Sequence, residues 1–225
     1  MGGETAGYKT SRATRPVTRA DLGLLDVVPG IFAVARDESF RQFWCNQAYA
    51  KAHDTEPEQM AGMTLRDVLP EELAEERESH MLRALEGGEA LTYDQMWRGG
   101  RYTTQCFPLD RDDLGARGWL VVLKLARPET EGPDGVVHSG DLGDLSPLSR
   151  RELEVFRLLG FGLTTPGIAE RLHRSPRTVE KHLDSIKRKL EIRTTSGLVR
   201  LSVERGLPGF TDEDFALIAQ ISTRG

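Results

Sequence analysis

Apolar residues between positions 175 and 190 recur at the spacing of an α-helix. When successive residues are rotated by about 100°, one narrow stripe collects four of them: Val179, Leu183, Ile186 and Leu190. Ser175 is a good N-cap residue, and Pro176 suits the first helical position, where its missing N–H is not needed. The pattern predicts a helix that begins at Pro176 and packs on a core through its apolar stripe.

The opposite face of this predicted helix is mainly basic. The residues on it are Arg177, Lys181, Asp184 and Arg188, and those on its flanks are Thr178, Ser185, Lys187 and Lys189. Such a face suits a polyanion. A lone basic helix is more often a solvated surface helix, however, so the choice depends on the neighbouring segments.

A short helix is predicted just before it. Thr165 is its expected N-cap and Pro166 its first residue, and apolar positions up to Leu172 share one face. Only three residues, 173–175, separate it from the next helix. Two helices joined by so short a turn are typical of a helix-turn-helix, whose second helix enters the major groove of DNA.

Further helices are predicted on both sides of this pair. Ser149 and Glu152 form a capping-box pattern, which starts a helix at Arg150. Another helix is expected over residues 196–205, with Gly206 as its stop. Thr211 is a suitable N-cap for a last helix in the tail.

Residues 145–207 resemble the LuxR-type (GerE-type) four-helix DNA-binding domain. The matching positions are Leu148, Glu152, Glu154, Val155, Leu158, Gly162, Ile168, Ala169, Leu172, Ser175, Thr178, Val179, His182, Ile186 and Leu190. The departures are Arg150, Pro166-Gly167, and Glu191 in place of the usual glycine after the recognition helix. The resemblance implies a bacterial transcriptional regulator that binds double-stranded DNA. The candidate DNA contacts are Thr164, Thr165, Arg177, Thr178, Lys181, His182, Ser185, Lys187 and Arg188.

The N-terminal half has the alternating pattern of short strands. The predicted strands are residues 31–35, 40–45, 91–97, 101–108 and 119–125, with a helix over 71–85 and shorter helical pieces over 18–27 and 48–60. Two strands, helices and then three strands is the order of a PAS domain. Residues 29–32, 46–49, 62–68 and 107–109 resemble PAS segments. The predicted fold class is therefore α+β: a PAS-like antiparallel five-stranded sheet with helices, plus an all-α helix-turn-helix domain.

Charge divides along the same plan. Residues 145–207 carry +6, whereas the rest of the chain carries −11, because the whole chain is −5. A basic segment attracts phosphates that an acidic one repels. The predicted domains are a flexible tail (1–17), a PAS-like sensor or dimerisation domain (18–127), a linker (128–144), the LuxR-type domain (145–207) and a C-terminal helical tail (208–225).

A homodimer is expected on two grounds. The strand over 119–125 is apolar on both alternating sets apart from Lys124, so its outer face must be covered by the helix before Val27 or by a second subunit. The last two helices present further apolar residues that a lone four-helix domain cannot all bury: Leu198, Leu201, Phe215 and Ile218. A protein that binds twofold-symmetric DNA sites also needs two copies of its DNA-binding domain.

Candidate ligand-binding residues in the PAS-like half are Cys45, Tyr93, Trp97, Thr104 and Cys106. Strand alternation explains these side chains equally well as core residues. His80 lies on the helix from which haem-binding PAS domains supply an axial ligand, but not at the expected place. The flavin photoreceptor signature is absent, and neither the cysteines nor the histidines have metal-ligand spacing. The cofactor is thus left unknown, with none expected, and no metal is predicted.

The main functional interpretation is a DNA-binding transcriptional regulator with a PAS sensory or dimerisation module. The alternative is a signal sensor whose working part is a PAS domain that carries haem, flavin or another small molecule. An enzyme is not expected, because no arrangement of nucleophile, base and orienting group stands out. No apolar run approaches the roughly 18 residues that span a bilayer, and the polar start MGGETAGYKT is no signal peptide, so a cytoplasmic protein without membrane contact is predicted.

Overall fold

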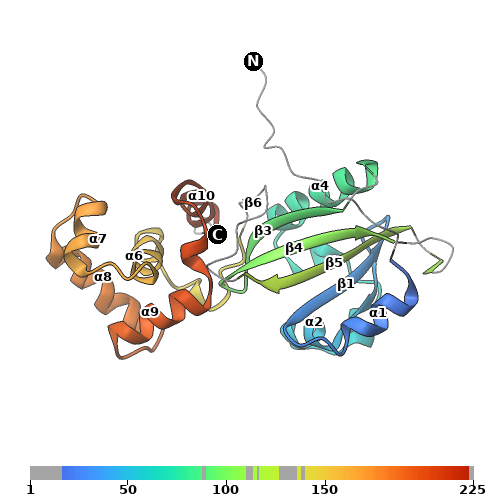
Figure 1. The fold of residues 1–225 in the computed structure, drawn as a ribbon, viewed down its shortest axis with the longest axis horizontal. Helices are drawn as coiled ribbons and strands as arrows, with labels where there is room; N and C mark the ends of the chain where they lie inside the picture. The colour runs from blue at the N-terminus through green and yellow to red at the C-terminus, as the bar shows by residue number, and fades with distance from the viewer. Residues whose placement is uncertain are drawn as a thin grey trace, which may run out of the picture. The chain divides into compact units, whose positions relative to one another are not determined.

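The computed structural model describes residues 17–87, 90–109, 114–115, 117–126, 136–137 and 140–222. They divide into two compact units. The first holds the described residues up to Asp94, Thr103–Leu125 and a short strand at 136–137, and the second holds Gln95–Tyr102, Ala126 and the described residues from 140 onward. Figure 1 labels many of the helices and strands of both units.

A six-stranded sheet in the order β2-β1-β5-β4-β3-β6 forms the framework of the N-terminal half (Figure 1). Its strands are β1 (Ile31–Asp37), β2 (Gln42–Cys45), β3 (Leu91–Trp97), β4 (Gly100–Pro108), β5 (Gly118–Leu125) and β6 (Val136–Val137). The antiparallel pair β1 and β5 runs in register from Ile31 opposite Lys124 to Asp37 opposite Gly118. The five predicted strands are confirmed, and β6 is an addition that lies inside the segment predicted as a linker.

The helices of the first unit also follow the predicted order. They are α1 (Arg19–Leu25), α2 (Gln47–Ala52), the 3-10 turn η1 (Pro57–Met60), the unpredicted α3 (Leu65–Val68), and α4 (Glu71–Gly87). Residues 1–16 of the predicted tail lie outside the described residues, whereas Val17 pairs with Leu109.

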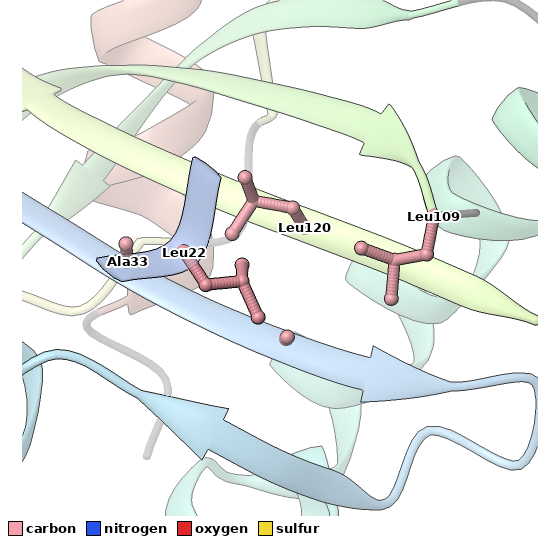
Figure 2. Close-up of a cluster of buried hydrophobic side chains, with 5 residues drawn as sticks. Leu22, Ala33, Leu109 and Leu120 are labelled. Atoms are coloured by element: carbon pink, nitrogen blue, oxygen red, sulfur yellow. The ribbon is translucent and has the colours of Figure 1, made fainter. Parts of the chain in front are cut away.

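Helix α1 covers the outer face of the sheet. Leu22 is 4% exposed and packs with Ala33, Ala35 and Leu120, and Leu109 completes the cluster (Figure 2). Partly buried side chains surround it, among them Val17, Ile31, Trp44, Phe107, Leu114 and Val122. The sequence predicted that either this helix or a second subunit covers the outer face of β5. In the structure the helix packs on it.

Asn46 ties three segments of the first unit together. Its Oδ1 accepts from the Tyr49 N–H at 3.0 Å, which caps α2, and from the Ala33 N–H at 3.1 Å. Its Nδ2 donates to the carbonyls of Leu25 (3.0 Å) and Ile31 (2.9 Å). One buried amide thus satisfies four backbone groups of α1, β1 and α2.

The second unit is mainly helical. Its elements are η2 (Gly143–Leu145), α6 (Arg150–Gly160), α7 (Thr165–Arg171), α8 (Pro176–Lys189), α9 (Thr195–Glu204), η3 (Leu207–Gly209) and α10 (Asp212–Ser222). The predicted caps of α6, α8 and α10 are confirmed: Ser149 accepts from Glu152 N, Ser175 from Thr178 N, and Thr211 from Asp214 N. This unit also contains the β3–β4 turn, where Arg98 and Gly99 have φ of 49° and 74° as in a type I′ hairpin.

Two sequence-based expectations about this unit are wrong. The N-cap of α7 is Thr164 rather than Thr165, because the Thr164 hydroxyl accepts from the Gly167 N–H at 3.4 Å, which moves Pro166 to the second helical position. Three of the four apolar residues expected to face a second subunit are buried within the chain. Leu198, Phe215 and Ile218 are 0%, 2% and 0% exposed, because α9 and α10 both pack on α6, whereas Leu201 is half-buried.

Candidate nucleic-acid interface

Helix α8 has one buried and one exposed face, as its sequence predicts. Val179, Leu183 and Ile186 are 1%, 5% and 0% exposed, so they fix the helix to α6 and α7. Arg177 and Lys181 are exposed on the other side and form no ion pair with another residue of the described ranges. This face therefore presents two cations that are available to an anionic partner.

The C-terminal half of the exposed face is partly engaged. Arg188 is exposed, and its guanidinium reaches the Ser185 hydroxyl at 3.5 Å. Lys187 is half-buried and pairs with Asp184 at 3.5 Å. Both cations remain near the surface of α8, but Asp184 lies between them and offsets part of their charge.

Ser185 and Lys189 are turned toward α6. The ammonium of Lys189 lies 2.6 Å from Oε2 of the buried Glu152, and Ser185 also hydrogen-bonds this carboxylate. Burial by itself raises the pKa of Glu152, but hydrogen bonds from Lys189, Ser185 and Ser149 outweigh it and lower the pKa to about 2. Glu152 thus sets the position of α8, and the structure does not group Ser185 with the exposed side chains.

The start of α8 and the turn before it supply the remaining candidates. Thr178 is half-buried, and its hydroxyl lies 2.8 Å from that of Ser175. His182 is half-buried, while Thr164 is exposed and Thr165 half-buried at the start of α7. The exposed Arg174, which the sequence reasoning missed, follows His173, whose φ of 51° ends α7. Arg174 lies in the three-residue turn between the two helices, and this position in the sequence could have identified it as a candidate DNA contact.

Glu191 occupies the glycine position after α8. Its φ is 55°, in the left-handed region, and the next N–H, that of Ile192, donates to the Lys187 carbonyl at 2.9 Å. The helix therefore ends with the usual C-cap geometry despite the glutamate.

All five candidate ligand residues of the PAS-like half are buried: Cys45, Tyr93, Trp97, Thr104 and Cys106. Tyr93 and Cys106 hydrogen-bond each other, whereas Cys45 contacts Met60 at 3.9 Å and Trp97 meets Tyr102 edge-on. Strand packing thus brings Tyr93 of β3 and Cys106 of β4 together.

Burial disfavours the charged forms of the two thiols and of the Tyr93 phenol. Burial raises the pKa of Cys45 to about 11 and that of Cys106 to about 12, and it raises the pKa of Tyr93 well above its usual value. His80 stacks on Tyr93, and its Nδ1 lies 2.7 Å from Arg83. Within the part of the chain that the structure describes, no group of three or more His, Cys, Asp or Glu side chains is placed to hold a metal ion.

Two family models match the chain. Residues 146–202 match bacterial regulatory proteins of the luxR family, and residues 25–124 match the PAS fold. The chain thus carries a PAS-fold segment followed by a luxR-family helix-turn-helix segment. None of the described helices is both long and apolar enough to cross a membrane.

Two transcriptional regulators match short stretches of the chain. The transcriptional activator protein ExaE of Pseudomonas putida is 41% identical over 63 residues, which is 28% of this chain and 29% of ExaE. The transcriptional regulatory protein MctR of Rhizobium johnstonii is 38% identical over 61 residues, 27% of this chain and 28% of MctR. The chain therefore spans less than a third of the length of these relatives. A solved VqmA–ligand–DNA complex from Vibrio cholerae is 19% identical over 87% of this chain and 91% of that one, with a TM-score of 0.45.

Proposed function

We propose that the protein is a DNA-binding transcriptional regulator, in which the luxR-family segment binds DNA and the PAS-fold segment senses a signal or holds two copies together. The observation that carries the proposal is the arrangement of α8. Its buried stripe and the Glu152 contacts hold the helix firmly, while Arg177, Lys181 and Arg188 face outward. A recognition helix needs such a rigid, basic outer face to reach base edges and phosphates.

The test begins with selection of bound duplexes from a randomised library by the full-length protein. Lys181→Ala is then compared with wild type on the enriched duplex and on a random one. A contact with guanine would make the loss on the enriched duplex about 1–3 kcal/mol. A phosphate contact would weaken both by a similar factor.

The control is Lys124→Ala, which removes the same charge from an exposed position on β5 and should change neither affinity. If the library yields no enriched sequence, the protein is not a sequence-specific regulator. If Lys181→Ala leaves both affinities unchanged, Lys181 is not part of the interface.

The proposed regulator acts as a homodimer through the end of α1. Leu24, Val27 and Val28 are 63%, 75% and 44% exposed. They lie within six residues of Leu22, whose side chain packs on the sheet. Exposed apolar residues this close together favour an interface. Sedimentation of the full-length protein should show a dimer that Val27→Asp weakens. Phe43→Asp, at another exposed apolar residue, is the control, and a wild-type monomer at micromolar concentration would contradict the proposal.

The proposed signal of the PAS-fold segment is a small molecule. Its candidate contacts are the buried side chains of Cys45, Tyr93, Trp97, Thr104 and Cys106. Absorbance of the purified protein above about 350 nm would instead favour the alternative, a haem or flavin sensor, because both cofactors absorb there. Native mass spectrometry would detect a colourless ligand.

A further inference from the structure

A pocket of about 270 Å³ lies within the second unit, between α6, α7 and α10. Its walls are Glu154, Arg157, Leu158, Arg171, Leu172, Asp212, Phe215 and Ala216. Helix α8 contributes no side chain to it, so the pocket is separate from the candidate nucleic-acid interface. Its volume is slightly below the roughly 300–1,000 Å³ of pockets for drug-sized ligands, which suits a small molecule.

One part of the wall is apolar. Leu158 and Phe215 are 4% and 2% exposed, and Leu172 at the end of α7 is half-buried. A ligand with a flat or short apolar body would bury its apolar surface against these side chains, which favours binding.

Arg157 brings a charged donor into the same wall. The residue is 5% exposed, and its guanidinium lies 5.0 Å from the Phe161 ring centroid and 5.2 Å from that of Phe215. Its Nη1 donates to Asp212 at 2.7 Å and its Nη2 to the Phe210 carbonyl, yet its Nε is buried without a hydrogen-bond partner. Because this Nε is closed off from solvent, a ligand would meet Arg157 through the Nη1 donor that Asp212 now occupies.

The two arginines of the pocket already bind a carboxylate of the chain. Asp212 bridges Arg157 and Arg171, and the hydrogen bond from Arg157 holds the pKa of Asp212 below its usual range. Glu154 is paired with Arg150 at 3.2 Å and with Arg151 at 2.6 Å. Among the side chains that line the pocket, Arg157 and Arg171 balance Asp212 and Glu154, and Asp212 is the carboxylate that both arginines bind.

We propose that this pocket binds a small carboxylate with an apolar body. The apolar part packs against Leu158, Leu172 and Phe215. The carboxylate accepts from Arg171 and Arg157, taking the place of the exposed Asp212 side chain at both guanidinium groups. Arginine suits this role because its donors match the two oxygens of a carboxylate. A ligand bound here would contact α7, the first helix of the helix-turn-helix, directly.

The test uses the full-length protein without DNA and benzoate as the probe, with benzamide as its uncharged isostere. We expect titration calorimetry or chemical-shift changes to show millimolar or tighter binding of benzoate, and benzamide to bind at least about tenfold more weakly, since it lacks the charge. Because DNA is absent, the result is independent of the proposed regulatory function.

Two variants separate this site from adventitious binding. Arg171→Gln should weaken benzoate binding by about fivefold or more, and Asp212→Asn should strengthen it, because the internal competitor loses its charge. The matched control is Arg200→Gln, another exposed arginine that pairs with an acid, Glu204, at 3.6 Å but does not line the pocket.

The helicity of each variant is first compared with that of wild type. If Asp212→Asn does not fold, the result for Arg171→Gln alone decides the test. Arg171 is about half-exposed, so its replacement should not disturb the core. The proposal is overturned if benzoate does not bind at millimolar concentration, if benzamide binds equally well, or if Arg171→Gln behaves like Arg200→Gln.

Discussion

Glu191 places a side chain where a helix usually ends in glycine. Its φ of 55° brings the Cβ too close to the backbone, which costs a non-glycine residue about 1 kcal/mol. We expect Glu191→Gly to stabilise the end of α8 by about 0.5–1 kcal/mol, because glycine removes this strain but gains entropy in the unfolded chain. Hydrogen exchange of the α8 amides is the measurement. Glu191→Ala, which keeps the Cβ, is the control, and an equal gain from alanine would contradict the explanation.

Glu152 links the beginning of α6 to the end of α8. Its pKa falls from 4.5 to about 2 on folding, so the carboxylate stabilises the folded state above pH 4.5 and loses this effect as pH falls toward 2. We expect Glu152→Gln to cost on the order of 2–3 kcal/mol at neutral pH.

The difference between Glu152→Gln and wild type should shrink steadily below pH 4.5. Hydrogen exchange of the α6 and α8 amides at several pH values measures it. Asp184→Asn, which removes an exposed carboxylate of α8, should show no such convergence. A pH-independent cost of Glu152→Gln would mean that the loss comes from packing rather than charge.

At the scale of elements, Asn46 holds α1, β1 and α2 in place through four backbone groups. We expect Asn46→Ala to destabilise the first unit by about 2–4 kcal/mol, since it leaves several buried groups unsatisfied. Fluorescence-detected unfolding follows this unit, which contains Trp44 and Trp119.

Asn46→Asp tests which half of the amide matters. It keeps the oxygen that accepts from Tyr49 and Ala33, but it faces the carbonyls of Leu25 and Ile31 with an acceptor. A stability close to wild type for Asn46→Asp would show that the contacts to these carbonyls contribute little.

For the whole molecule, charge segregation decides how salt acts on DNA binding. The net charge is −5, yet residues 145–207 carry +6, so the affinity should fall steeply with salt although the protein is acidic. If Arg177 contacts a phosphate, Arg177→Gln should make the slope of log affinity against log salt shallower by about 1. Lys124→Gln should leave the slope unchanged. An unaltered slope for Arg177→Gln would remove Arg177 from the phosphate contacts.

The sequence by itself determined the elements whose signals are local. The caps at Ser149, Ser175 and Thr211 and the stripe of Val179, Leu183 and Ile186 depend on residues within a few positions of each other, and all are found as predicted. The five strands likewise follow from alternation and turn residues. The sequence also predicted that Arg177 and Lys181 point outward, because helical periodicity assigns side chains to faces.

Only the tertiary structure decided which partner each face meets. Periodicity places Ser185 and Lys189 on a flank of α8, but Glu152, which is 37 residues from Lys189, turns them inward. In the same way the packing of α10 on α6, rather than a second subunit, buries Phe215 and Ile218 of α10. The bridge of Asp212 to Arg157 and Arg171 joins α10 to two helices that lie 55 and 41 residues away in sequence at these positions. Such contacts depend on how whole elements pack, and a pattern repeated every few residues specifies a face without specifying what covers it.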